Sequence, residues 1–394
     1  MEKTFAIDKK KIIIIAAIGV ALIIAIILFA TGIVGDLLGK WGILKIQPVE
    51  PKVTFYEYIP KGDGDVILLD DQLLIADQSG VSCFSVDGTW QWNKEINLKA
   101  PVFIPDGEEK TVLGDVGGNG IYGFNEDGLQ WNYIIDREIV NISENTVNNQ
   151  IIIIHDADNY LSAATLVDYS KEVKAIATRK FGQYYMISAS MSQNGEQAAI
   201  VGITPESEET STVIAFMDLP GYEFISTKTI SNEFLPVASY VNGNNLFLAG
   251  GDSLRRVLED SSYTKQNSVN DLLWGREGGS DTLVAAGNTD GKNFVTVSTV
   301  AGAEAGLEAS SEVRLYASDG ALKESFTCEG GIEAVKHYGK MIALYGENEV
   351  FVYNIYGQQI GKFDGVSQIS DIEFISEKIL VVCGTSKIAK VDFS

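Results

Sequence analysis

The two histidines of the chain, His155 and His337, are the first side chains to consider for metal or acid–base chemistry. A catalytic zinc site needs three protein ligands and one open position. The two histidines lie in different predicted strands, far apart in the sequence, so further carboxylates would have to reach them from elsewhere. We therefore interpret each histidine as a strand-edge or core residue and predict no metal site on them.

Acidic and amide side chains gather at three predicted turns, residues 63–65, 70–71 and 156–159. Oxygen ligands at alternate positions could coordinate Ca²⁺, but none of these segments matches the twelve-residue loop that ends in a glutamate. Aspartate and asparagine favour turns because they hydrogen-bond their own backbone. We interpret these segments as turns, and the acidic stretch 206–209 as a solvated loop tip between strands.

Sequence patterns for nucleophilic or phosphate chemistry are missing as well. The chain has no Gly-x-Ser-x-Gly, and its Gly-Gly-Asn-Gly at 117–120 precedes a predicted strand, whereas a phosphate cradle would precede a helix. Cys83, Cys328 and Cys383 are far apart and lie in or beside apolar runs, as buried thiols do. One pair could still be bridged outside the cell, since distant strands can meet across a closed ring. We predict no catalytic, cofactor-binding or metal-ligating residue, and no cofactor.

The charge balance bears on the class of partner. Asp and Glu number 53 against 30 Lys and Arg, which gives a net charge of −23 in 394 residues. Such a field repels nucleic acid, so we exclude a nucleic-acid partner. The acidic excess also keeps an exposed surface soluble.

A repeated hairpin phrase identifies the elements that must position any site. An alternating strand, then Asp-Gly, then a second strand occurs at Asp87-Gly88, Asp127-Gly128 and Asp319-Gly320, with a looser copy at Tyr356-Gly357. The first two copies lie about 40 residues apart, and each repeat holds four strand-sized runs, which is typical of a propeller blade. The 39 glycines and only 8 prolines fit short strands and tight turns.

Counting these units predicts an all-β, eight-bladed β-propeller. The fifth unit is the least defined, with its fourth strand placed near Tyr263, and the sixth carries a long insertion at 301–311. The last unit ends one strand short, so we expect the strand at 53–58 to complete it and close the ring. A seven-bladed propeller is the alternative if the fifth and sixth units merge.

The N-terminal segment predicts a membrane anchor. Residues 12–34 are almost wholly apolar, and about 20 such residues span a bilayer core. Lys9, Lys10 and Lys11 precede them, which favours a cytoplasmic tail at 1–11. A linker at 35–51 would then lead to an extracytoplasmic propeller at 52–394, with the lipid bilayer as partner of the helix. A cleaved signal peptide is the alternative, although this apolar stretch is longer than is usual for one.

Tryptophans after the hairpin turns carry a family resemblance. Trp90 and Trp92 follow the first turn and Trp131 the second, as in quinoprotein-like (PQQ-type) eight-bladed propellers, where such a tryptophan docks one blade on the next. The sixth unit has Phe326 instead. The layout of the whole chain looks like the uncharacterised single-pass membrane β-propeller family of Gram-positive, clostridia-like bacteria, a domain of unknown function. That resemblance implies no known chemistry, and the adjacent cysteines of some quinoprotein dehydrogenases are lacking.

These observations favour a membrane-anchored, extracytoplasmic propeller that acts as a non-catalytic binding or scaffolding module for a protein or cell-envelope partner. The loops at 204–211 and 301–311 both join a second to a third strand, so we expect them on one rim, where a partner would bind. The alternative is an enzyme, binding a ligand or metal at the propeller axis.

Overall fold

The computed structural model describes residues 47–205, 210–258, 270–275, 282–289, 292–299 and 310–394. The chain divides into two compact units, Met1–Gln47 and Pro48–Ser394. The membrane helix expected at 12–34 lies outside the described residues. Within the described ranges, no helix is long and apolar enough to cross a membrane.

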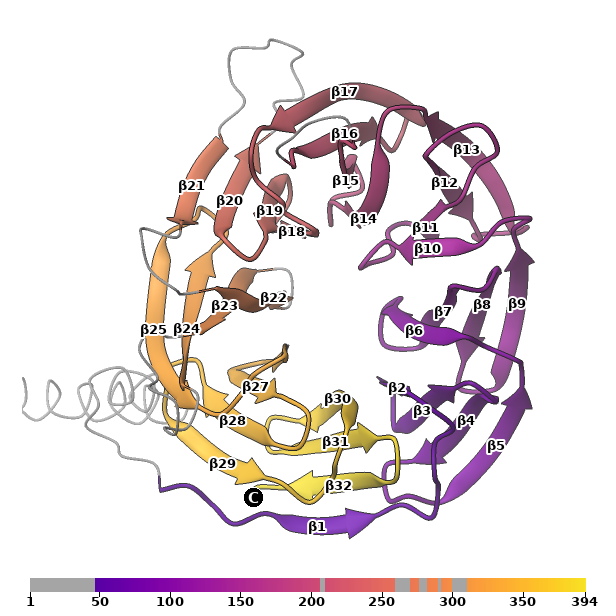
Figure 1. The fold of residues 1–394 in the computed structure, drawn as a ribbon. Coiled ribbons are helices and arrows are strands. Elements are labelled where there is room, and N and C mark those ends of the chain that lie inside the picture. Colours follow the sequence, from indigo (N-terminus) through magenta and orange to yellow (C-terminus); the bar gives the residue numbers. More distant parts are fainter. Residues whose placement is uncertain (1–46, 206–209, 259–269, 276–281, 290–291, 300–309) are drawn as a thin grey trace, which may run out of the picture. The chain divides into compact units, whose positions relative to one another are not determined.

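The unit Pro48–Ser394 consists of eight four-stranded antiparallel sheets arranged around a common axis (Figure 1). The predicted eight-bladed propeller is therefore confirmed. The seven-bladed alternative is wrong, because the fifth and sixth units form separate sheets and do not share a ladder. In each blade the strands run from the axis outward in sequence order, except that the last blade takes its outermost strand from the start of the unit.

The first four blades, which we number 1 to 4, follow one another without interruption in the sequence. Their strands are β2 (Asp65–Leu69), β3 (Gln72–Asp77), β4 (Gly80–Ser85) and β5 (Trp90–Glu95); β6 (Ala100–Pro105), β7 (Lys110–Val116), β8 (Gly120–Asn125) and β9 (Gly128–Ile134); β10 (Ile139–Ile142), β11 (Gln150–His155), β12 (Ser162–Asp168) and β13 (Lys174–Phe181); and β14 (Tyr185–Met191), β15 (Gln197–Ile203), β16 (Thr212–Asp218) and β17 (Glu223–Ile230).

Blades 5 to 8 form the second half of the ring and have the same four-stranded arrangement. Its strands are β18 (Val237–Val241), β19 (Asn245–Ala249), β20 (Ser253–Leu258) and β21 (Asn270–Gly275); β22 (Leu283–Thr289), β23 (Asn293–Thr299), β24 (Ser310–Ala317) and β25 (Leu322–Glu329); β26 (Ala334–Tyr338), β27 (Met341–Tyr345), β28 (Val350–Asn354) and β29 (Gln359–Phe363); and β30 (Ile369–Ser376), β31 (Ile379–Gly384), β32 (Ile388–Asp392) and β1 (Lys52–Phe55).

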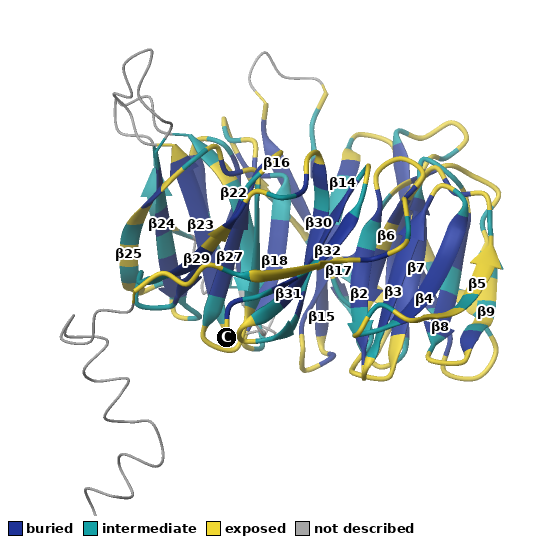
Figure 2. Cartoon of the chain, turned by 90° about the horizontal axis from the view of Figure 1, so that it is seen from below, coloured by how far each residue is buried: buried dark blue, intermediate teal, exposed yellow. Residues whose placement is uncertain are grey.

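Burial explains the apolar pattern of the strands. The second and third strands of a blade are covered on both faces by neighbouring blades, so β11 is buried along its whole length and β3 over all but its first residue. The outermost strands face solvent on one side, and β5 and β9 alternate or remain exposed (Figure 2). The hydrophobic core is therefore a series of layers between adjacent blades, not one central cluster.

The Asp-Gly turns join the third and fourth strands, as the repeat predicts. Gly88 has a φ of 91° and donates its N–H to Ser85 O at 2.8 Å, and Gly320 has a φ of 86° and donates to Ala317 O at 2.9 Å. Glycine adopts this left-handed conformation without steric cost. A register shift follows each turn, which is typical of a hairpin with a bulge.

Aromatic residues after these turns dock blades 1, 2 and 6 on the blade that follows. Trp92 of β5 stacks on Phe124 of β8, with ring centroids 6.2 Å apart. Trp131 of β9 stacks on Tyr169 of the third blade at 4.8 Å, and Phe326 of β25 packs against Tyr353 of β28 at 5.0 Å. Trp92 and Trp131 therefore have the docking role that the resemblance implied. In the sixth blade Phe326 has this role.

The first strand of the unit completes the last blade. β1 pairs antiparallel with β32, with Val53 opposite Val391, so the chain's first and last propeller strands lie side by side (Figure 1). The strand is Lys52–Phe55, shorter than the expected 53–58. Beyond it, Tyr56 still donates its N–H to Ile388 O at 3.0 Å, and the chain then bends at Glu57. The rings of Tyr56 and Tyr58 pack on Phe84 of blade 1, at ring distances of 5.9 and 5.4 Å.

Two sequence expectations fall on residues outside the described ranges. The fourth strand of blade 5 was expected near Tyr263, which is not described; that place is taken by β21, whose Trp274 pairs with Leu254 of β20. The expectation was wrong because the apolar residues that pair with β20 come later in the sequence. The insertion at 301–311 is described only from residue 310 onward.

Candidate binding site at the propeller axis

A pocket of about 680 Å³ lies at the axis and is lined by the innermost strands of four blades. Its walls come from β2 and β6 on one side and from β26 and β30 on the other. The turns that join the first and second strands of blades 1 and 2 also line it, so it opens on the face that carries the Asp-Gly hairpins. We call this cavity the axial pocket. Its volume lies within the usual range for sites that bind small molecules or peptide segments.

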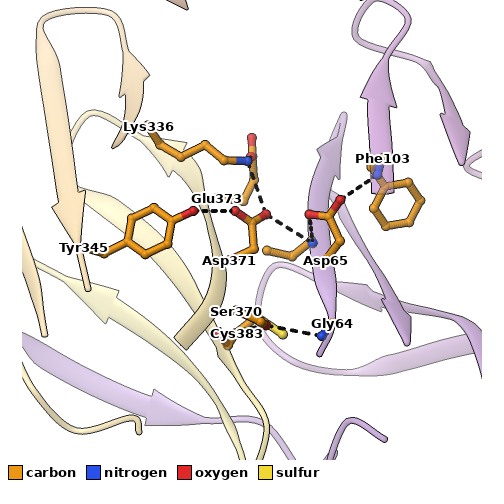
Figure 3. A network of polar contacts seen from close by, with 10 residues as sticks. Gly64, Asp65, Phe103, Lys336, Tyr345, Ser370, Asp371, Glu373 and Cys383 are labelled. Carbon is orange, nitrogen blue, oxygen red and sulfur yellow. Dashed lines mark hydrogen bonds and ion pairs between the residues drawn. The ribbon is translucent and has the colours of Figure 1, made fainter. Parts of the chain in front are cut away.

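A polar network at the pocket crosses the seam between the last blade and the first (Figure 3). Asp371 of β30 accepts a hydrogen bond from the backbone N–H of Val66 at 3.4 Å. Asp65 of β2 accepts one from the backbone N–H of Phe103 on β6, at 2.6 Å, and another from Val66 at 2.8 Å. Through these two carboxyl groups, the inner strands of blades 8, 1 and 2 are linked in series.

Blade 7 contributes the cation of this network. Lys336 of β26 lies with its Nζ 3.2 Å from Asp371 Oδ2 and 3.8 Å from Glu373 Oε2. Tyr345 of β27 donates its hydroxyl to Asp371 Oδ1 at 3.1 Å. Asp371 is buried, whereas Lys336 and Glu373 keep side-chain exposures of 36% and 24% and line the axial pocket.

Burial and mutual repulsion shift the protonation of these groups. Burial and the neighbouring Asp371 carboxylate raise the pKa of Asp65 well above its usual range. Burial raises the pKa of Glu373 to about 7, against the opposing effect of Lys336. For Lys336, burial lowers the pKa, but the carboxylates of Asp371 and Glu373 outweigh it, so the ammonium is strongly favoured. A set of perturbed groups in one cavity indicates a functional site.

The hydrogen bonds assign different roles to the three carboxyl groups. The oxygens of Asp65 and Asp371 are occupied by backbone N–H groups, Lys336 and Tyr345, so these two residues hold blades together. Among the described residues, Glu373 is joined to the network only by its longer contact with Lys336. Glu373 is therefore the carboxyl group best placed to meet a ligand.

Apolar residues form the rest of the wall. Phe103 and Phe374 are almost fully buried beneath the pocket, and Tyr338, which is 41% exposed, stacks on Phe374 at 5.9 Å near the mouth. Leu68 and Ile375 are half-buried beside them. A ligand in this pocket would therefore meet both charge and apolar surface.

A second axial cavity lies at the opposite face, between blades 5, 6 and 7. It has a volume of about 360 Å³ and an almost wholly apolar lining that includes Val237, Leu283 and Val335. The loops at 204–211 and 301–311 join second to third strands and so belong to this face, but residues 206–209 and 300–309 lie outside the described ranges.

Comparison with known proteins adds a family and a fold. The sequence matches a family of unknown function, DUF5711, over residues 56–393. The chain belongs to this family. No curated protein sequence matches the chain.

Three solved structures that are similar to this family member are distant in sequence. BamB from Moraxella catarrhalis is 11% identical with a TM-score of 0.55, and the match covers 86% of this chain and 100% of that one. The WD40 domain of SCAP from fission yeast is 8% identical with a TM-score of 0.53, covering 87% and 95%. The Dos1 propeller is 11% identical with a TM-score of 0.55, covering 88% and 95%. These similarities show the propeller fold.

The histidines lie in separate blades of this family member. His155 is buried on β11, where Nε2 lies 2.9 Å from Thr165 Oγ1 and Nδ1 lies 2.7 Å from Asp156 O. Burial lowers its pKa, which favours the neutral ring. His337 is on β26 in blade 7. Among the described residues, no group of three or more His, Cys, Asp or Glu side chains is arranged to hold a metal ion.

The other segments considered in the sequence lie in turns or in the core. Asp70 and Asp71 form the turn between β2 and β3, and residues 117–119 connect β7 to β8, which begins at Gly120. The three cysteines are buried and unbridged. Asp65 was considered only as a possible calcium ligand in a turn, yet it is the first residue of β2 and faces Asp371 across the seam.

Sequence reasoning missed Lys336, Asp371 and Glu373. A signal for Asp371 and Glu373 was present, because each stands between apolar residues of an innermost strand, whereas Lys336 is followed by His337 on β26 and is less distinctive. On β30, Asp371 and Glu373 alternate with Ile372 and Phe374, so the two acidic side chains point to the same side of the strand. Innermost strands have the axis on one side, so charged residues at such positions are candidates for an axial site.

Proposed function

We propose that this protein is a membrane-anchored, extracytoplasmic propeller that binds a partner protein at the mouth of the axial pocket and carries out no chemistry itself. The observation that carries the proposal is the axial pocket, in which charged groups with shifted pKa values from blades 1, 7 and 8 stand beside apolar walls. Anchoring is supported by the apolar segment 12–34 behind Lys9, Lys10 and Lys11.

Binding fits the geometry better than catalysis does. Catalytic carboxyl groups must reach the reacting atoms, whereas Asp65 and Asp371 are held by backbone N–H groups of neighbouring blades. A rigid ring with a pocket at its axis presents loops and walls in a fixed geometry, which lowers the entropic cost of binding.

One observation favours a second candidate, an enzyme or ligand-binding protein with its site at the axis. Glu373 has a pKa of about 7 and lines the pocket, and a pKa near the working pH is what general acid–base catalysis requires. This candidate predicts that the purified full chain carries a bound ion or cofactor. Elemental analysis and an absorbance spectrum would reveal it.

A photo-crosslinking experiment in cells tests the leading proposal. Tyr338 is replaced by benzoylphenylalanine, which keeps an aromatic ring at the pocket mouth. The control is the same replacement at Tyr160, which is similarly exposed at 47% but lies in the connection between β11 and β12, on the opposite face. We expect a discrete crosslinked protein from position 338 and not from 160. No crosslink, or the same pattern from both positions, would reject binding at this mouth.

A further inference from the structure

The charged residues that line the axial pocket are mostly acidic. Glu373 lies on its wall, and Asp70, Asp71 and Glu108 lie on exposed turns at its mouth, whereas Asp65, whose pKa is raised well above its usual range, adds little negative charge. Lys336 is the one basic residue among the described residues that line it, and it is already paired with Asp371 and Glu373. The pocket therefore keeps a negative potential that the internal ion pair does not cancel, and a concave wall concentrates such a potential.

The walls select among cations of different kinds. A small hydrated ion gains nothing from Phe103, Phe374 and the exposed ring of Tyr338. Lysine and arginine side chains instead place an apolar stem against such surfaces and carry the charge at the end. The ring of Tyr338, which stacks on Phe374 and remains partly exposed, can contact a cation as well. A volume of about 680 Å³ leaves room for residues on both sides of the basic one.

We propose that the axial pocket binds a basic, partly apolar peptide segment of a partner protein, with a lysine or arginine side chain directed toward Glu373. This inference rests on the proposed function and specifies the chemistry of the partner. The stem of the basic side chain packs between Tyr338 and Ile375, and the residues next to it meet Asp70 and Asp71 at the mouth.

This arrangement makes binding depend on pH in a defined direction. The charged groups that act on Glu373 are Lys336 from β26, 3.8 Å away, and Asp371 from its own strand. Tyr338 and Asp65 line the same pocket, and Tyr345 from β27 is bonded to Asp371. Because burial raises the pKa of Glu373 to about 7, its carboxylate becomes fully charged only above neutrality. A basic segment therefore binds more tightly at pH 8 than at pH 6, and its binding releases a proton below pH 7.

The test uses the full chain, purified in mild detergent and immobilised, with capped hexapeptide libraries as probes. One library has a fixed central lysine or arginine between random neighbours. A second has norleucine at that position, which keeps the alkyl stem and removes the charge. We expect the basic library to be retained at least tenfold better at pH 8 and 0.15 M salt, with retention falling severalfold at pH 6.

Variants separate the pocket from the acidic surface in general. Glu373→Gln and the double change Asp70→Asn/Asp71→Asn should each reduce retention of the basic library severalfold, and Glu373→Gln should also abolish its pH dependence. Asparagine suits the position of Asp70, which has a φ of 47°. The control is Glu144→Gln, because Glu144 also has a pKa raised to about 7 but does not line the pocket. Unfolding midpoints of all variants establish that they are folded.

Each outcome has one meaning. Equal retention of the basic and norleucine libraries, or a preference that survives in all pocket variants, overturns the proposal. Displacement of the peptides by spermine together with direct binding of spermine at equal affinity also overturns it, because the pocket would then bind a free polyamine. If crosslinking from position 338 still identifies a partner in any of these cases, the proposed function stands. Only the proposal that the partner presents a basic segment to the pocket is then wrong.

Discussion

The hydroxyl group of Tyr56 donates a hydrogen bond to the backbone carbonyl of Val86, 3.3 Å away, across the seam where the ring closes. The same contact occurs between blades 1 and 2, where the indole N–H of Trp92 donates to Glu126 O at 2.9 Å. Tyr56 also packs on Phe84 as Trp92 packs on Phe124. The tyrosine that follows β1 thus replaces, at the seam, the tryptophan that docks one blade on the next.

Removing the Tyr56 hydroxyl should weaken the seam without breaking it. We expect Tyr56→Phe to lower the free energy of unfolding by about 1 kcal/mol, because the Val86 carbonyl loses a partly buried donor. Tyr56→Ala should cost about 3 kcal/mol or more, since the ring contact with Phe84 is lost too. Denaturant unfolding measures both changes. Tyr160→Phe, at an exposed site, is the control, and an equal effect there would contradict the docking role.

Deleting the closing strand should have a larger effect. A chain that starts at Pro48 keeps β1, whereas a chain that starts at Glu57 loses β1 and Tyr56 and leaves the ladder of β32 unpaired. An unpaired strand edge is also a site for aggregation. We expect the shorter chain to unfold at a markedly lower temperature or to aggregate, as size-exclusion chromatography and circular dichroism would show. Equal stability of the two chains would mean that β1 does not close the ring.

Lys336 should stabilise the folded protein by neutralising the carboxylates beside it. Lys336→Met leaves Asp371 and Glu373 without their cation, and we expect a loss of about 1–3 kcal/mol at pH 7.5, because the lysine is partly exposed. The loss should shrink at pH 5, where Glu373, with its pKa raised to about 7, binds a proton. Lys99→Met is the control: the Lys99–Glu138 pair is exposed on both sides and should contribute less than about 0.5 kcal/mol.

Titration of Glu373 should lower the stability of the folded protein as the pH rises toward neutrality. Glu373 has a pKa of about 7 when folded, against about 4.3 in an unfolded chain, so its contribution is fully present below about pH 4.3 and is lost as the pH rises to about 7. We expect this group to account for roughly 1–3 kcal/mol between pH 5 and pH 8. Glu373→Gln should flatten the dependence and make the protein more stable at pH 8. A parallel curve for the variant would show that Glu373 is not the titrating group.

The fold could be predicted from the sequence because its signals are local. An Asp-Gly turn, a flanking alternating strand and a following aromatic lie within a few residues of one another, so Gly88 and Gly320 mark blades without any knowledge of distant contacts. The closing strand could also be predicted, since the last unit has three strands and Val53 begins an alternating run that belongs to no other blade. Blade 5 was placed poorly at its outer strand because no turn of this kind precedes β21.

The site could not be predicted in the same way because it exists only after the ring has closed. Val66 and Asp371, which hydrogen-bond at the seam, are 305 positions apart, and Asp65 resembles any other turn aspartate in the sequence. The shifted pKa of Glu373 results from burial that only the assembled blades provide. What the sequence does contain is the alternation of charged and apolar residues on β30, which is informative once that strand is known to be innermost.

Membrane topology can be tested with cysteine labelling, because the native thiols are protected. Cys83, Cys328 and Cys383 are at most 2% exposed, and burial raises their pKa values to about 12, 11 and 12. Such thiols react slowly, since the thiolate is the reactive form. A new cysteine at an exposed position should therefore carry nearly all the label.

We expect Ser394→Cys to react with a small membrane-impermeant maleimide in intact cells, because the propeller would lie outside. Thr4→Cys, in the tail before Lys9, should react only after lysis. Labelling of Thr4→Cys on the full-length protein after lysis would also exclude cleavage of the apolar segment, because a cleaved chain would have lost that position. Protection of Ser394→Cys in intact cells with labelling after lysis would place the propeller in the cytoplasm and reject the proposed orientation.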